Sequence, residues 1–176
     1  MKKTILLSAF AIAVSCWAQA PTAPVKMGLW HGTTVSKITG FQLPPEVVER
    51  MKQMGRPVPG SEPRTIETES CLTPEKWKEM FTRLNEDRED CKIENLKQDS
   101  SSMSADIVCN MQRGGNGKGH IQFNFLSSEK VHGTMHMEMV TPRQPQPIVV
   151  DTTIDSAYQG SDCKGVSPDD PKVIMK

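Results

Sequence analysis

The sequence predicts an α+β domain that is mainly β, with a curved antiparallel meander of about seven strands, two short helices and two disulfides. Three observations lead to this prediction. Segments in which apolar and polar residues alternate outnumber segments with helical periodicity. The connections between the last five alternating segments are short, as they are between neighbouring antiparallel strands. Four cysteines follow a secretory leader, so paired thiols are expected.

Residues 1–20 have the three parts of a cleavable signal peptide. Two lysines precede the apolar stretch Ile5–Val14, and Ala18–Ala20 supplies small residues for cleavage, with cleavage after Ala18 as the alternative. Cys16 is a candidate lipoprotein anchor, but the large aliphatic residue expected three positions before such a cysteine is missing. We therefore expect a periplasmic protein with one domain over residues 21–163 and a disordered tail over residues 164–176.

The charge pattern excludes some classes of partner. The chain carries 21 basic and 21 acidic residues, and the basic residues are scattered. Nucleic acids and anionic membranes attract clustered positive charge, so we expect neither as a partner. No apolar run after the leader is long enough to span a bilayer, so no transmembrane segment is expected once the signal peptide is removed.

The first half of the mature chain alternates strands and helices. A strand is predicted over residues 27–39, with Gly32 as a candidate bulge, and a second over residues 64–71. A helix over residues 45–54 begins with a proline and can end at Gly55 in a left-handed conformation.

The second helix has the clearest sequence signals. Thr73 is a predicted N-cap, a proline follows at the first helical position, and Asn85 can end the helix. Its core-facing stripe, with helical spacing, consists of Trp77, Met80, Phe81 and Leu84.

The rest of the chain predicts an antiparallel meander. Polar, glycine-rich or proline-rich turns separate strands predicted over residues 91–97, 103–111, 118–126, 130–140 and 148–158. Because short connections join neighbours, these five strands should pair in sequence order. The glycine-rich stretch 113–120 lacks the phosphate-loop pattern and is interpreted as a hairpin turn.

The hairpin around residue 100 predicts the disulfide pairing. A turn at QDSSS places Cys91 and Cys109 at symmetric distances on adjacent strands, where side chains are close enough to join. Cys71 and Cys163 then form the second bridge. The alternative joins Cys71 to Cys91 across the second helix, and sequence alone does not fix the connectivity.

With these elements in place, the chain resembles the domain-of-unknown-function 3617 family of bacterial exported proteins. The matching pieces, in order, are KMGLW, PPEVVERMKQMG, CLTPEKW, EDC, IVC, GTMHMEM and GSDC. The resemblance covers nearly the whole mature chain and keeps the order of all four cysteines. It implies the compartment and the architecture, but no catalytic residue. His120, His132 and His136 depart from the expected pattern, in which Thr and Lys would be more usual.

One strand carries the candidate metal ligands. Met135, Met137 and Met139 alternate with His136, and thioethers with imidazoles suit Cu(I). A metal site formed within this one strand is excluded, because His132 and His136 are ~13 Å apart and cannot bind the same ion. His120 opposite His136 would bring two ligands together, but the sequence does not fix the register. The favoured interpretation is that the methionines fill the inner face of the sheet and the histidines face water.

No catalytic motif is present: the sequence has no C-x-x-C and no G-x-S-x-G. The function predicted from the sequence is therefore a non-catalytic exported envelope protein, without a cofactor, that binds an apolar ligand or a partner protein. The alternatives are a periplasmic copper-type metal-binding protein that uses the Met and His residues above, and an enzyme without a recognisable motif.

Overall fold

A computed structural model describes residues 23–58, 60, 62–85, 91–111, 114–142 and 146–174, without the side chains of residues 81–85 and 111. The predicted signal peptide and Cys16 lie outside the described residues. The elements are β1 (Gly28–Thr39), α1 (Pro45–Gln53), β2 (Arg64–Leu72), α2 (Pro74–Asn85), β3 (Cys91–Gln98), β4 (Ser102–Met111), β5 (Gly115–Ser127), β6 (Lys130–Val140), β7 (Ile148–Gly160) and β8 (Lys172–Ile174).

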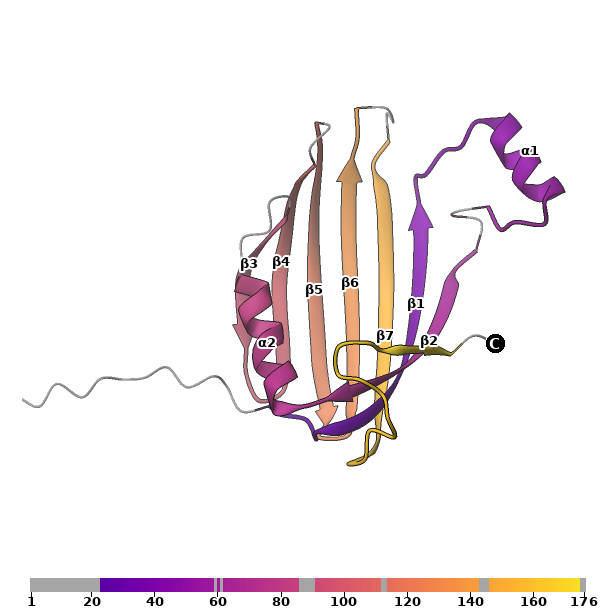
Figure 1. Cartoon of the computed structure of the whole chain (residues 1–176). Coiled ribbons are helices and arrows are strands. Elements are labelled where there is room, and N and C mark those ends of the chain that lie inside the picture. Colours follow the sequence, from indigo (N-terminus) through magenta and orange to yellow (C-terminus); the bar gives the residue numbers. More distant parts are fainter. Residues whose placement is uncertain are drawn as a thin grey trace, which may run out of the picture.

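All eight strands form one open antiparallel sheet in the order β3-β4-β5-β6-β7-β1-β2-β8. Figure 1 shows α2 lying across one face at the β3–β4 side, while α1 stands beyond the end of β1. The predicted α+β class and the β3–β7 meander are confirmed. None of the residues in α1 is buried, whereas α2 packs its Trp77 into the core.

Two details differ from the sequence predictions. The irregularity in the pairing of β1 with β7 lies between Leu29 and Trp30, not at Gly32. A Cβ on Gly28 would lie 2.2 Å from the carbonyl oxygen of Gly160, so the missing side chain of Gly28 permits the close approach there. The tail after Cys163 is not irregular throughout, because Lys172–Ile174 pairs with Glu67–Glu69 of β2 and adds an eighth strand.

Both predicted disulfides are present. Cys91 and Cys109 are direct cross-strand partners with Cα atoms 4.0 Å apart, and the Cys71–Cys163 Cα atoms are 5.4 Å apart. The turn between β3 and β4 has the expected place because the Asp99 carboxylate accepts hydrogen bonds from the backbone N–H groups of Ser101 and Ser102, both at 2.7 Å. The hydrogen bond from the Ser101 N–H is the largest cause that lowers the pKa of Asp99 to about 2.

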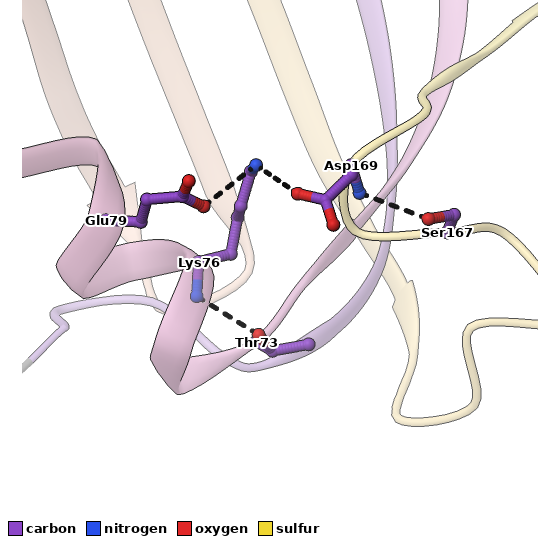
Figure 2. A network of polar contacts seen from close by, with 5 residues as sticks. All are labelled: Thr73, Lys76, Glu79, Ser167 and Asp169. Atoms are coloured by element: carbon purple, nitrogen blue, oxygen red, sulfur yellow. Dashed lines mark hydrogen bonds and ion pairs between the residues drawn. The ribbon is translucent and has the colours of Figure 1, made fainter. Parts of the chain in front are cut away.

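The chain after Cys163 fastens α2 to the sheet. We call residues 163–174 the C-terminal strap. As Figure 2 shows, the Lys76 ammonium group donates to Asp169 of the strap at 2.7 Å and to Glu79 at 3.1 Å. Thr73 is the N-cap as predicted, since its hydroxyl accepts the Lys76 backbone N–H at 3.1 Å. The disulfide and this ion pair together hold the start of α2 in place.

Strand alternation gives the sheet two different faces. The inner face is the one that α2 covers, and it contributes Trp30 to a core cluster with Val25 and Trp77 of α2. Trp30 contacts Tyr158 edge-on with ring centroids 5.8 Å apart, and Trp77 contacts Phe125 at 6.3 Å. The outer face carries the polar side chains of the same strands.

A glycine in β6 makes room for an aromatic ring of β5. Gly133 pairs directly with Phe123, and a Cβ on Gly133 would lie 2.6 Å from two atoms of that ring. The ring therefore lies over the glycine, which is an arrangement that pins strand register.

We expect Gly133→Ala to destabilise the protein by ~1–3 kcal/mol, because the ring must shift within a packed face. Gly117→Ala is the matched control, since its Cβ would meet no atom closer than 3.5 Å. Urea denaturation of both variants measures the difference. Equal free energies of unfolding for the two variants would contradict the placement of Phe123.

Candidate functional site

The three alternating methionines lie on the inner face, as predicted, and each is partly rather than fully buried. Their direct partners on β5 are Ile121, Gly119 and Gly117, in the order of Met135, Met137 and Met139. A Cβ on Gly119 would lie 3.0 Å from the sulfur of Met137, so the thioether occupies the space above the glycine. Flexible methionine side chains over glycines give this part of the face an adaptable apolar surface.

A partly open cavity of about 150 Å³ lies between α2 and the inner face. Trp77 and Met80 of α2 line one side, and Phe123 and Phe125 of β5 belong to the sheet side. The remaining lining residues are Val25, Trp30, Ser70, Leu72, Met103, Val131 and Ser156. No charged side chain is among them. The polar side-chain groups are the two serine hydroxyls and the indole N–H groups of Trp30 and Trp77, and the Trp30 N–H donates to the Lys26 carbonyl oxygen.

A second hollow of about 280 Å³ lies at the opposite end of β1. Ser36 and Ile38 line it together with residues of the loop between α1 and β2, including Glu62, and with Arg64 at the start of β2. It is more polar than the cavity under α2. No histidine lines either space.

The outer face carries three histidine–aspartate pairs, each joining two strands. The Nδ1 atom lies 2.8 Å from Asp106 in His120, 2.8 Å from Asp155 in His132, and 2.7 Å from Asp151 in His136. The histidine side chains are between 34% and 53% exposed, as predicted for residues that face water.

The aspartates of these pairs were missed by the sequence analysis, although a signal was present. His132 and His136 are four residues apart, and so are Asp151 and Asp155. In antiparallel neighbours, equal spacing brings both pairs into register together, and the observed partners are His132 with Asp155 and His136 with Asp151.

The histidine–aspartate pairs change the pKa values of two side chains, His136 and Asp106. A hydrogen bond to Asp151 raises the pKa of His136 above its usual 6.5, with a smaller contribution from Glu138, whose carboxylate lies 3.7 Å from the His136 Nε2 atom. The hydrogen bond from His120 and a second from Asn95 lower the pKa of Asp106 below its usual 3.8. Both effects favour charged side chains on the outer face.

The structure separates the predicted copper ligands into two groups. The methionines are on the inner face, whereas His120, His132 and His136 are on the outer face, so one ion cannot contact both. The register does place His120 directly opposite His136. Among the described residues, no three His, Cys, Asp or Glu side chains are already gathered around a common point.

The fold and its disulfides define a small β-sheet domain in which one helix covers part of an apolar face. Residues 25–163 match the family model described as "Protein of unknown function (DUF3617)", and the chain belongs to this family. No curated protein matches the chain. An S-type phycobiliprotein lyase from Guillardia theta is similar at 9% identity and a TM-score of 0.32, over 77% of this chain and 89% of that one. Within the described ranges, neither helix is long and apolar enough to cross a membrane.

The His136–Asp151 pair should make folding stability depend on pH. Since the pKa of His136 is raised in the folded protein, the pair stabilises fully below pH 6.5, and this contribution is lost as the pH rises through the folded-state pKa. For Asp106, whose pKa is lowered, the stabilisation is present above 3.8 and is lost as the pH falls through the folded-state value.

We therefore expect His136→Thr to lower the free energy of unfolding, measured by urea denaturation, by more at about pH 5.5 than at about pH 8. These two values lie on either side of the usual histidine pKa. Thr134→Val, a non-titrating change on the same strand face, is the control and should cost the same at both pH values. A cost of His136→Thr that stays constant or grows with pH would be evidence against the pair.

Proposed function

We propose that the protein is an exported, non-catalytic domain of the bacterial envelope that binds a neutral, apolar small molecule between α2 and the inner face of the sheet. The observation that carries this proposal is the cavity of about 150 Å³ with no charged side chain in its lining. The bridges Cys71–Cys163 and Cys91–Cys109 support export, because such disulfides persist in oxidising compartments.

The size and lining of the cavity define the chemical class of the ligand. An apolar cavity of roughly 150 Å³ is large enough to hold a molecule the size of one aromatic ring. A charged ligand would lose its hydration without gaining a counter-ion in this lining, so it is disfavoured. The hydroxyls of Ser70 and Ser156 provide the few polar contacts that orient a ligand in an otherwise apolar site.

The inner face also provides a path for a longer ligand. Beyond the cavity, the apolar surface continues along β5 and β6 from Phe123 past Met135, Met137 and Met139. The stretch from Val131 to Met139 is ~27 Å long at the usual rise of a strand. An elongated apolar molecule with one end under α2 would lie along these methionines, which adapt to varied shapes.

The position of α2 makes the cavity, and Met80 stands at its rim. The Met80 side chain lines the cavity while being 37% exposed, so it is accessible from solvent. On the same helix, Glu75 is exposed and does not line the cavity. These two positions form a matched pair for a test of ligand entry.

We expect the uncharged fluorescent probe N-phenyl-1-naphthylamine to bind the wild-type protein with its phenyl ring under α2 and its naphthyl group along the methionines. Unlabelled apolar compounds should displace it. Met80→Trp should weaken binding about tenfold, equivalent to ~1.4 kcal/mol, because a larger side chain fills the rim. Glu75→Trp should leave the affinity unchanged. Fluorescence titration measures both.

A charged analogue provides the second control. The sulfonate probe 8-anilino-1-naphthalenesulfonate should bind more weakly than the neutral probe, since the lining offers no counter-ion. Absence of neutral-probe binding, or an equal loss in Met80→Trp and Glu75→Trp, would refute the proposed site.

A further inference from the structure

The chain's four histidines are all described, and His120 and His136 are the two that face each other across a strand pair. His120 on β5 is the direct partner of His136 on β6. His132 is opposite Asn124 and Asp155, and His31 is opposite Glu69 and Ala157. Side chains directly opposite on one face have Cβ atoms about 4.5–5.5 Å apart, so the two imidazoles are neighbours.

The two rings are held from their outer sides. His120 directs its Nδ1 atom to Asp106 on β4, and His136 directs its Nδ1 atom to Asp151 on β7. Strands β4 and β7 flank the β5–β6 pair on opposite sides. The two nitrogens of an imidazole lie on opposite flanks of the ring, so each Nε2 atom lies on the side of its ring that faces away from its aspartate.

This hydrogen bonding also fixes the tautomer that a metal ion requires. Above its pKa, a histidine that donates its Nδ1–H to a carboxylate presents an unprotonated Nε2 atom, and metal-binding histidines are commonly oriented in this way. Glu138 adds a carboxylate close by, 3.7 Å from the His136 Nε2 atom, with its side chain 58% exposed.

From this arrangement we propose that His120 and His136 form a binding site for a divalent transition-metal ion on the outer face of the sheet, with Asp106 and Asp151 orienting the two rings. Imidazole nitrogens suit Zn²⁺, Cu²⁺ and Ni²⁺, and a carboxylate is an acceptable further ligand. Since no three candidate side chains are already gathered in the described residues, the protein contributes two nitrogens, and water or a rotated Glu138 completes the coordination.

The proposed site is independent of the apolar cavity. The two sites occupy opposite faces of the sheet, so either can exist without the other. A metal ion here would join β5 to β6 through their side chains. Because the ion binds the folded state, it should also raise the resistance of the protein to unfolding.

The test uses the mature protein without a histidine tag. Isothermal titration with Zn²⁺ should show one ion per chain, and His120→Thr and His136→Thr should each weaken binding by at least about tenfold. The loss of binding free energy in the double variant should be smaller than the sum of the two single losses, because either substitution alone already breaks the two-ring chelate of one ion. Asp106→Asn should weaken binding by roughly 10- to 100-fold while leaving the stoichiometry at one.

His132→Thr is the matched control, since His132 has the same hydrogen bond to an aspartate but no histidine opposite. It should bind Zn²⁺ as the wild type does. Electron paramagnetic resonance of the Cu²⁺-loaded protein should show coupling to two imidazole nitrogens, reduced to one in either single variant. No Zn²⁺ binding, an equal loss in His132→Thr, or additive losses from two independent single-histidine sites would overturn the proposal.

Discussion

The register between β5 and β6 is the constraint on which both candidate sites depend. It places Gly119 opposite Met137 on the inner face and His120 opposite His136 on the outer face. A slip of one residue would move every side chain of one strand to the other face of the sheet. The methionines would then face water, and the histidine pair would be lost. The packing of Phe123 over Gly133 disfavours such a slip, because the ring fits where no Cβ stands.

The two disulfides stabilise the domain, and one of them helps to hold α2 against the inner face. The buried apolar side chains among the described residues are few, and one cluster of them consists of Val25, Trp30 and Trp77. Cross-links with sequence separations of 18 and 92 residues stabilise by ~3 and ~5 kcal/mol in the loop-entropy model. That is a large share of the ~5–15 kcal/mol typical of a domain. The Cys71–Cys163 bridge serves a second purpose, because it and the Lys76–Asp169 contact hold α2 over the cavity.

Local signals in the sequence predicted much of this fold. The turn at Asp99 sets Cys91 against Cys109, and Thr73 with Pro74 begins α2, so the pairing of the meander and the disulfides could be predicted. Long-range pairings could not be predicted. The insertion of β1 between β7 and β2 and the addition of β8 depend on contacts between segments that are distant in the sequence. The candidate metal site could not be predicted because it depends on the β5–β6 register. The alternation of apolar and polar residues fixes which face a side chain occupies, but a shift of the register by two residues preserves that alternation. The cavity depends on how α2 packs, which a periodic stripe does not specify.

The most direct test of the central claim is a measurement of the β5–β6 register in solution. In an isotope-edited nuclear Overhauser spectrum of the protein, we predict cross-peaks between the backbone protons of His120 and His136 and between those of Gly119 and Met137. Cross-peaks that instead connect His120 with Met135 or Met137 as direct partners would contradict the account. The two faces would then carry different side chains from those on which both sites are built.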